Sequence, residues 1–407
     1  MTYKFDPLTP EFAANPYPTY AALRQLDKPV YFAAVDMWML SRYDDIAQIT
    51  QDPKMVRSLV GHCDEAELKQ RQIQANWHDM PYHERVVQSS LLDSDGPTHK
   101  RLRKLVLNTF TRNSITELKP YVESLIKRLL EKQHDNVSFD FVEQVAEEVP
   151  GHVIGRLLGV PEADVPQLRE WSHTIVGYFD VDRTMEKKQK AETATKEFYQ
   201  YLQDMREERR KKPKDDLVSR MIAADQGGIY SDDEFVSVCM LLLMAGHGST
   251  TDVLGTGLHT LIQHPDSMNV LRNHPSKMQN ALQEMFRFEP PLPFFHRHTL
   301  RDVEIRGHSF EAGTTFGILY ASANRDSSQF VDPDKFEIDR FPNRHLAFGQ
   351  GAHFCLGNFL ARQNMEIIFS ELLNNYKSIE LVDDLVPYKS GLSVRGPESM
   401  NIQLVKH

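Results

Sequence analysis

The chain has 407 residues, and its 47 Lys and Arg against 57 Asp and Glu give a formal net charge of −10. This acidic balance excludes a general nucleic-acid binder, which carries a basic excess. The three cysteines, Cys63, Cys239 and Cys355, are far apart, which excludes a disulfide framework and a CxxC zinc module. The first residues carry no secretory pattern, and no apolar run approaches the roughly 18 residues of a membrane span. We therefore expect a cytoplasmic protein.

The predicted elements are mostly helical when they are taken in chain order. A short helix is expected near 18–25, followed by strand-like runs at 29–34 and 38–41. Helical patterns dominate from about 98 to 290, and the charged segment 184–212 is predicted to be a solvated helix. Short strand-like runs follow at 301–308, 314–319, 379–388 and 399–406. No repeat or Gly/Ser linker divides the sequence, so we expect one domain over residues 1–407, mainly α with small discontinuous β-sheets.

A long helix from Asp232 to about Leu261 is the most informative of these elements. Ser231 is a plausible N-cap, and the acids that follow it suit the positive end of the helix dipole. The middle, LLLMAG, is apolar on every side and predicts burial on all faces, and GHGSTTD follows it. Glycine inside a helix costs about 1 kcal/mol relative to alanine. Gly246 and Gly248 therefore indicate either close approach of a flat ligand or tight packing against another helix.

The strongest local signal is the segment 348–362, FGQGAHFCLGNFLAR. Cys355 lies among three glycines, just before a predicted helix, where amide donors and the helix dipole are expected to lower its pKa and favour the thiolate. Phe348 and Phe354 would shelter the sulfur, as a ligand of haem iron requires. A buried inert cysteine and a catalytic cysteine nucleophile are the alternatives for this residue.

The FGxGxHxCxG spacing resembles the cysteine loop of the cytochrome P450 family, and further motifs follow in that family's order along the whole chain. The resemblance implies the cytochrome P450 fold over 1–407, with no fused reductase, and a haem b whose iron is ligated by Cys355. It implies a monooxygenase that inserts one oxygen atom of O2 into a small molecule, with electrons from a separate protein. A non-catalytic haem-thiolate sensor or carrier is the rival from another class.

The resemblance also assigns residues around the haem. Glu284 and Arg287 match the family's ExxR motif, and Arg340 matches the third member of that charge network, whose role is structural. Four residues match partners of the haem propionates: His99, Arg103, Arg297 and His353. Further cofactor contacts are implied for Phe348, Ala245, Gly246 and Gly357.

The central helix departs from the family pattern, Ala-Gly-x-acid-Thr-Thr/Ser, in which an acid and an alcohol relay protons to dioxygen. Gly248 replaces the acid, and Ser249 replaces the usual threonine. Gly248, Ser249 and Thr250 are the catalytic candidates, because Ser249 can still donate a hydrogen bond and Gly248 leaves room for water. An ordinary monooxygenase, oxidative coupling or desaturation, and direct use of peroxide all remain open.

The resemblance places the substrate pocket on four segments: the 60–92 loop, the central helix, the 292–296 segment and the turn near 392–394. The loop is a candidate mobile lid. Bulky side chains on the other segments favour a largely apolar, possibly aromatic substrate, with His296 as a polar anchor and core packing as the alternative for each Phe. The candidates are Leu243, Met244, His247, Leu292, Phe294, Phe295, His296 and Leu392. A role for His247 as a relay or iron ligand is disfavoured, since its position in the family faces away from the haem.

A basic island, residues 99–104, stands out in this acidic sequence. In the family, the corresponding helix borders the face where an acidic electron donor docks. We therefore expect a ferredoxin-type or flavodoxin-type partner steered by charge. A solvated helix face is the alternative for Lys100, Arg101 and Lys104. No nucleic-acid or membrane partner is expected, and the protein is expected to be a monomer.

Overall fold

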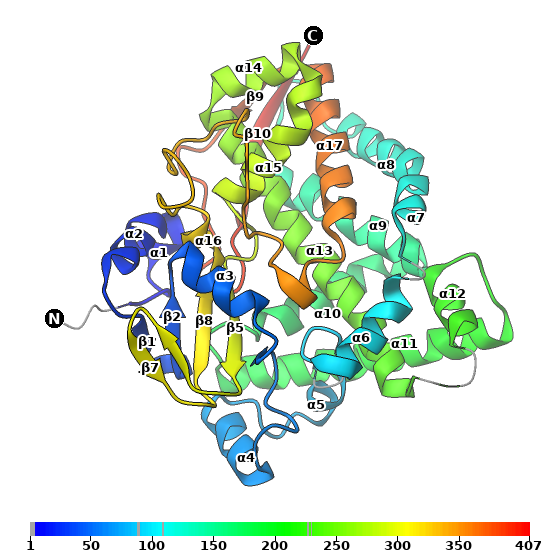
Figure 1. The fold of residues 1–407 in the computed structure, drawn as a ribbon. Helices are drawn as coiled ribbons and strands as arrows, with labels where there is room; N and C mark the ends of the chain where they lie inside the picture. Colours follow the sequence, from blue (N-terminus) through cyan, green and yellow to red (C-terminus); the bar gives the residue numbers. More distant parts are fainter. Residues whose placement is uncertain (1–4, 88–89, 108–109, 226–227, 229) are drawn as a thin grey trace.

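A sheet-rich part packs beside a larger helical part in the computed structural model, which describes residues 5–87, 90–107, 110–225, 228 and 230–407 (Figure 1). The expected fold class, mainly α with small separate sheets, is confirmed. The first helices have these bounds: α1 (Pro10–Ala14), α2 (Tyr17–Gln25), η1 (Ala33–Val35), α3 (Tyr43–Gln51), α4 (Glu65–Gln74) and α5 (Pro81–Val87), of which α5 packs against α11 and α13.

The main sheet has five strands in the order β1-β2-β8-β5-β3, and only the β2–β8 pair is parallel. Its strands are β1 (Val30–Phe32), β2 (Met37–Leu40), β3 (Met55–Val56), β5 (Phe294–Thr299) and β8 (Thr315–Leu319). A second sheet joins β4 (Ser138–Asp140), β10 (Asn401–Lys406) and β9 (Tyr376–Leu381), and a hairpin joins β6 (Val303–Ile305) to β7 (His308–Phe310). Strand β5 overlaps the 292–296 segment, which the sequence assigned to the pocket and not to a strand, and it pairs with β8 from Phe294 to His298.

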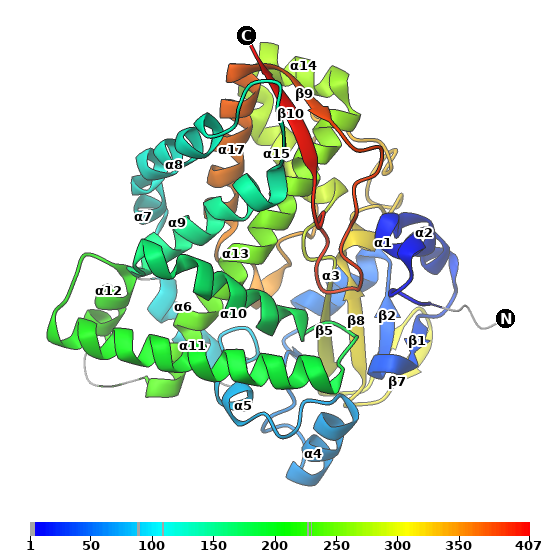
Figure 2. The same ribbon diagram turned by 180° about the vertical axis from the view of Figure 1, so that it is seen from behind.

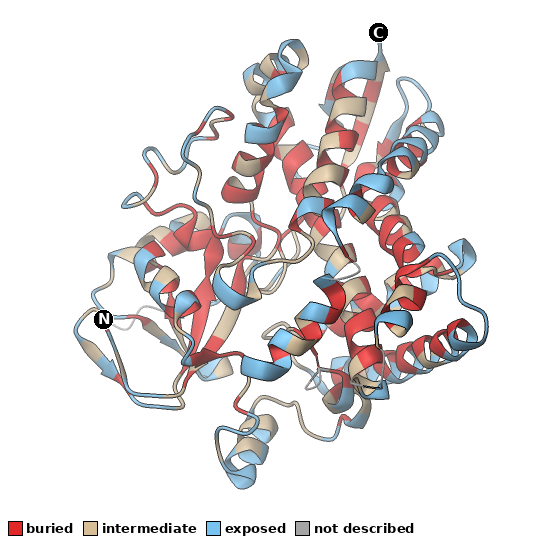
Figure 3. Cartoon of the chain, turned by 45° about the vertical axis from the view of Figure 1, so that its right-hand side comes forward, coloured by how far each residue is buried: buried red, intermediate tan, exposed pale blue. Residues whose placement is uncertain are grey.

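Helices make up most of the remaining chain (Figures 1 and 2). They are α6 (Gly96–Leu107), α7 (Arg112–Glu117), α8 (Lys119–Glu131), η2 (Val142–Ala146), α9 (Glu148–Leu158), η3 (Glu162–Asp164), α10 (Val165–Gly177), α11 (Met185–Lys211), α12 (Leu217–Ala224), α13 (Asp232–Gln263), α14 (Pro265–Asn273), η4 (Pro275–Lys277), α15 (Met278–Phe288), α16 (Tyr320–Ala323), η5 (Gly351–His353) and α17 (Asn358–Asn375). The largest hydrophobic cluster joins the inner faces of α5–α15 and α17, and exposed residues gather on their outer faces (Figure 3).

The central helix α13 forms as the sequence predicted and runs for 32 residues. Ser231 accepts the N–H of Glu234, whose side chain bonds back to the Ser231 amide, so a capping box closes the first turn. Within the described chain α13 is the one helix long and apolar enough to pass as a membrane span by composition, but 67% of that window is buried inside the protein. It is therefore the core helix around which the others pack.

The charged helix α11 is solvated on one side only, which corrects the prediction for 184–212. Phe198 and Leu202 lie in the core, and the Arg206 and Arg209 side chains are 3% and 1% exposed. Arg209 Nε donates to Asp216 Oδ2 at 2.6 Å, so the buried guanidinium is neutralised. Long arginine stems can cover apolar surface while their heads are paired, which charge counting along the sequence does not detect.

A buried ion network ties α15 to the long segment that precedes the cysteine loop. Glu284 and Arg287 are both 0% exposed, and their side chains form two hydrogen bonds, at 2.7 and 2.8 Å. Glu284 also accepts from Arg340 Nε at 3.2 Å and from Asn343 Nδ2 at 3.0 Å. The remaining N–H groups of Arg287 donate to the carbonyl oxygens of residues 324, 333 and 335. The network thus holds residues 324–343 against α15.

We predict that Glu284→Gln lowers the free energy of unfolding by about 3–5 kcal/mol, because it leaves two buried guanidinium groups facing a neutral amide. Urea unfolding followed by circular dichroism measures this change. Glu131→Gln is the matched control, since Glu131 pairs with Lys127 at 4.0 Å on the surface and its loss should cost less than about 1 kcal/mol. Equal losses in the two variants would contradict the structural role of the network.

Candidate active site

Cys355 lies in the turn between η5 and α17, where the sequence placed it. Its amide donates to the carbonyl oxygen of Phe348 at 2.9 Å, which closes the loop. The amides of Gly357 and Asn358 donate to its sulfur. Gly349 and Gly351 have φ of 66° and 71°, a left-handed conformation that glycine adopts without strain. The loop therefore points two amide donors at one sulfur atom.

The pKa of the Cys355 thiol does not fall as the sequence suggested. Burial raises it, and this effect outweighs the two amide donors and the nearby Arg103 and Arg362, all of which favour the thiolate. Burial destabilises the charged thiolate by more than the partial charges at a helix N-terminus stabilise it. Such a sulfur is protected and becomes anionic when a metal ion binds it, because a coordinating thiol loses its proton outright.

The four predicted propionate partners come together near this loop from three separate elements. His99 and Arg103 lie on α6, Arg297 lies on β5, and His353 lies in η5. The rings of His99 and His353 are 4.2 Å apart, and Arg103 Nη2 donates to the carbonyl oxygen of Phe354 at 2.6 Å. Burial, together with His353 and Arg103, lowers the pKa of His99 to about 4. The cluster is therefore rich in donors and favours an anionic partner.

Two residues that the sequence analysis missed hold this cluster in place. Asp95 accepts from His353 Nε2 at 3.1 Å and from the Arg57 amide at 2.7 Å. The Arg57 side chain is 5% exposed, pairs with Asp93 at 2.9 Å and donates to the carbonyl oxygen of His296 at 3.0 Å. These contacts join β3, the start of α6, β5 and η5. The joined residues are far apart in the sequence, and Asp95 beside Gly96 indicated only the beginning of a helix.

These residues fit a haem on three independent observations. The buried Nε2 atom of His99 has no hydrogen-bond partner among the described residues, as expected of a group waiting for a propionate. A Cβ placed on Gly248 would meet nothing within 4 Å, although α13 is a core helix. Ala245 is exposed on the same helix, directly after the buried Leu243 and Met244. A flat apolar ring with two carboxylates matches this combination of open space, donors and a sheltered sulfur.

The face of α13 that borders the open space includes Leu241, Ala245, Gly248 and Ser249, which are all incompletely buried and recur at helical spacing. Ser249 Oγ donates to the carbonyl oxygen of Ala245 at 2.8 Å. Leu241 was not among the sequence candidates, although its spacing of four residues from Ala245 could have identified it. Thr250, predicted to be catalytic, is only 5% exposed and lies about 100° around the helix from Ser249, outside this face.

Three other candidates on α13 face neighbouring helices instead. A Cβ on Gly246 would come within 3.2 Å of Ile154, so tight packing against α9, the second alternative, accounts for this glycine. His247 Nε2 lies 3.2 Å from the carbonyl oxygen of Glu147, and Leu243 and His247 line a small cavity with α9 and α10. The pocket role expected for Leu243 and His247 is therefore corrected. Met244 is 7% exposed and belongs to the core.

Among the pocket candidates in the 292–296 segment, one lies in the core and the others remain partly exposed. Phe294 packs in the cluster with Phe5 and Met39, so the core alternative applies to it. Leu292, Phe295 and His296 remain partly exposed. The Phe295 ring lies 5.3 Å from the Arg57 guanidinium, and His296 Nδ1 lies 3.5 Å from its Nη1. This part of the site is therefore apolar with one polar edge.

Leu392 is 0% exposed and packs in the same cluster as Phe294, which corrects its pocket assignment. Its neighbours Ser393 and Val394 are partly exposed. The amides of Leu392 and Ser393 donate to the carboxylate of Asp180 at distances of 2.8–3.2 Å. Asp180 thus holds the 391–394 turn against the connection between α10 and α11.

The candidate lid, residues 60–92, includes α4 and α5, and its residues 88–89 lie outside the described part. Asn76 has φ of 57° and fastens the lid to the α10–α11 connection. Its side chain donates to the carbonyl oxygen of Arg183 at 2.9 Å and accepts from Lys188 at 3.2 Å, while its own carbonyl accepts from Tyr178. The Trp77 ring packs 5.0 Å from that of Tyr178. These contacts tie the 60–92 segment to the α10–α11 connection in this structure.

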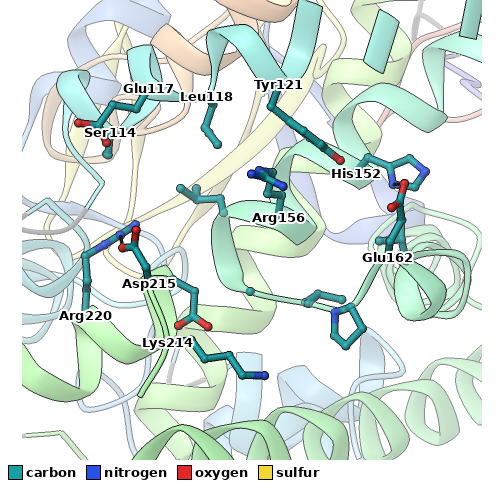
Figure 4. A pocket seen from close by; sticks show the side chains of 16 residues that line it. Ser114, Glu117, Leu118, Tyr121, His152, Arg156, Glu162, Lys214, Asp215 and Arg220 are labelled. Atoms are coloured by element: carbon teal, nitrogen blue, oxygen red, sulfur yellow. Dashed lines mark hydrogen bonds and ion pairs between the residues drawn. The ribbon is translucent and has the colours of Figure 1, made fainter. Parts of the chain in front are cut away.

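A cavity of about 660 Å³ lies elsewhere, between α8, α9 and the segment before α12 (Figure 4). Its charged residues offset one another: Arg156 lies 4.4 Å from the Tyr121 ring centre, and His152 lies 3.7 Å from Glu162. None of the residues predicted to bind cofactor or substrate lines it. The volume of a cavity therefore does not identify the active site in this protein. The cysteine loop identifies it.

Comparison with known proteins agrees with this geometry. The sequence matches the cytochrome P450 family over residues 15–403. It is 31% identical to the polyketide biosynthesis cytochrome P450 PksS of Bacillus subtilis, with 99% of each chain covered. It is 32% identical to the 6-deoxyerythronolide B hydroxylase of Saccharopolyspora erythraea, covering 99% of this chain and 100% of that one. The structure of P450BioI with acyl carrier protein ligated to hexadec-9Z-enoic acid matches with a TM-score of 0.88 at 27% identity, covering 97% and 99% of the two chains.

The chain therefore belongs to the cytochrome P450 family. It is a haem-thiolate monooxygenase, and its relatives act on small molecules with electrons from redox partners. Among the expectations from the sequence, those for the family, the fold class, the cofactor and the enzyme class are confirmed.

Proposed function

We propose that this protein hydroxylates a largely apolar, acyl-chain-like small molecule, with Cys355 as the iron ligand and a separate ferredoxin-type or flavodoxin-type protein as the electron donor. The observation that carries the proposal is the sulfur of Cys355, sheltered and held by two amides beside a cluster of basic side chains. When bound, the haem supplies the activation of dioxygen, and a thiolate ligand favours cleavage of the O–O bond.

The chain's own residues bind the cofactor and control its surroundings. His99, Arg103, Arg297 and His353 would hold the propionates, and the amides of residues 357 and 358 would limit the charge on the sulfur. Phe348 packs 4.4 Å from the ring of Phe286 and keeps water from one side of the loop. The Ser249 hydroxyl is the polar side-chain group on the open face of α13; it donates to the Ala245 carbonyl oxygen and can accept from water, for which Gly248 leaves room.

The substrate class follows from the side chains that remain partly exposed. Leu241 and Ala245 on α13, with Leu292 and Phe295 on the β5 side, are apolar. Because Phe294 belongs to the core, the pocket is less aromatic than its sequence indicated. P450BioI was solved with a long acyl chain on its carrier protein, and PksS belongs to polyketide biosynthesis. These names support an aliphatic substrate, free or carrier-bound.

The electron donor would dock on the face formed by α6, the start of α7 and the cysteine loop. Lys100, Lys104 and Arg112 are exposed there, around the exposed apolar side chains of Leu107, Phe354 and Phe359. Arg101, by contrast, forms an ion pair with Glu234 and helps to anchor α13, so it is not part of this surface. An apolar centre with a basic rim suits a small acidic protein. We propose that the enzyme works in this way as a cytoplasmic monomer.

Oxidative coupling or desaturation is the second candidate outcome, and the observation that favours it is the glycine at 248. Product analysis with dioxygen as oxidant separates the two, because hydroxylation adds one oxygen atom to the substrate and the other reactions remove hydrogen only. Peroxide use is identified by product formation without any electron donor.

We predict that hexadec-9Z-enoic acid shifts the Soret band of the ferric protein to shorter wavelength, because a bound apolar chain displaces water from the iron. A Soret titration with the free acid, its acyl carrier protein thioester and testosterone measures this. A larger shift with the thioester would assign a carrier-bound substrate. A shift with testosterone alone would overturn the acyl-chain proposal.

Replacing Cys355 by alanine should abolish the thiolate-type absorption of the reduced protein with carbon monoxide. Cys239→Ala is the matched control, since that thiol is buried in α13 away from the loop and its removal should leave the spectrum unchanged. Persistence of the thiolate-type spectrum in Cys355→Ala would show that the ligand assignment is wrong.

The double variant Lys100→Glu/Lys104→Glu should slow reduction by an acidic surrogate ferredoxin about tenfold at low salt, because it reverses the charge that steers the partner. Stopped-flow reduction at two ionic strengths measures this, and the difference should shrink at high salt. Lys127→Glu/Lys132→Glu on α8 makes the same change of charge at another exposed site and should have little effect. Equal slowing in both double variants would argue for net charge rather than for a docking face.

A further inference from the structure

Asp252 is the buried acid of α13 that lies one turn beyond the relay position. It follows Gly248 by four residues and Ser249 by three, so all three side-chain positions share one face of the helix. The Asp252 side chain is only 1% exposed. A carboxylate buried this deeply in the core helix requires a compensating partner.

That partner is Lys389, from the turn that also carries Val394. Lys389 Nζ lies 2.7 Å from Asp252 Oδ1, and the lysine side chain keeps 20% exposure next to the exposed Ser390. The backbone of this turn approaches closely: a Cβ on Gly396 would lie 2.3 Å from Asp252 Oδ1. The pair thus connects a buried position on α13 with the water-accessible surface.

The second oxygen of the carboxylate has no such partner. Asp252 Oδ2 is buried and makes no hydrogen bond within the part of the chain that the structure describes. An unsatisfied buried acceptor is costly, so its presence calls for a role beyond the ion pair. The same helix face leads, one turn back, to the open space beside Gly248 and to the Ser249 hydroxyl.

Other titratable groups face this pair from the elements around it. His173 on α10, Glu147 before α9 and Lys389 all act on the Asp252 carboxyl. Burial raises the pKa of Asp252, and Lys389 opposes that rise.

We propose that Asp252 and Lys389 relay protons from solvent to the space beside Gly248 and Ser249, replacing the acid that this chain lacks at position 248. The proposal rests on the proposed monooxygenase function and adds a route for its protons. Both residues act through Ser249 and water, so they are relay residues rather than catalytic ones.

The overall reaction that needs these protons consumes one substrate R–H, one O2, two electrons and two protons, and gives R–OH and one water. The electrons come from the external donor. In each transfer, Lys389 Nζ gives a proton to Asp252 and regains one from solvent. The carboxyl group turns about its Cβ–Cγ bond and releases that proton from its other oxygen to water beside Gly248. Ser249 Oγ accepts it and passes on its own.

Asp252→Asn tests the relay, since it keeps the shape of the side chain and removes the proton that the carboxyl can exchange. With saturating surrogate ferredoxin and reductase, and hexadec-9Z-enoic acid as probe, O2 consumption should fall about tenfold or more. Its solvent isotope effect should rise, because proton transfer becomes rate-limiting. Oxidation driven by hydrogen peroxide, which brings its own protons, should stay within twofold of the unmodified protein.

Infrared difference spectroscopy gives a readout that does not depend on activity. The unmodified protein should show a carboxyl band that titrates with pH, shifts in D2O and is missing in Asp252→Asn. Asp216→Asn is the matched control, because it breaks another buried ion pair, with Arg209, far along the chain from this face. Lys389→Met is the second variant and should reproduce the slower O2 consumption even if Asp252→Asn fails to fold.

Unchanged O2 consumption and an unchanged isotope effect in either folded variant would overturn the relay, as would equal slowing in Asp216→Asn. Absence of any titrating band assigned to Asp252 would overturn it as well. If the unmodified protein consumes no O2 with the donor system, the proposed function fails instead. The infrared comparison still decides whether Asp252 exchanges a proton in that case.

Discussion

The site depends on one buried carboxylate, that of Glu284, which accepts hydrogen bonds from two guanidinium groups, an amide side chain and a backbone N–H. Such a group is stable inside a protein only when its charge and its lone pairs are all satisfied, and here they are. Through Arg287 and Arg340, Glu284 fixes residues 324–343, which have almost no regular secondary structure of their own. The cysteine loop begins where that segment ends.

Cys355 lies between two chemically different environments, one basic and one apolar. On one side, basic groups from α6, β5 and η5 provide the positive potential that two carboxylates require. On the other side, α13 provides an apolar face with a single hydroxyl. The protein thus anchors a charged periphery while keeping the reacting centre poor in water, which strengthens the few hydrogen bonds that remain.

Local sequence signals predicted the parts of the site that local geometry controls. The Ser231 N-cap of α13, the glycine turns around Cys355 and the spacing of Glu284 and Arg287 all act within a few residues, and all formed as expected. The direction in which each side chain of α13 points was harder to predict. The faces of Gly246, His247 and Thr250 depend on where α9 and α10 pack, and nothing within α13 specifies this.

The sequence also did not predict contacts between residues that are far apart along the chain. Asp95 and Arg57 are joined to His353 and His296 across more than 200 residues, so the sequence alone carried no signal for them. Strand β5 was missed because its FFHRHT run has no clear alternation of apolar and polar residues. Leu392 was assigned to the pocket because it lies in the right turn, but the turn buries that side chain and exposes its neighbours.

The contacts at Asn76 add a cost to the binding of any ligand that enters between the 60–92 segment and the α10–α11 connection. Asn76, Tyr178, Arg183 and Lys188 join two loops through specific hydrogen bonds, and these must break before a ligand can pass between the loops. For a ligand that enters by this route, the observed affinity equals the intrinsic affinity multiplied by the fraction of time in which these bonds are broken. A sequence change at Asn76 could make a poor ligand look like a good one without touching the cavity that receives it.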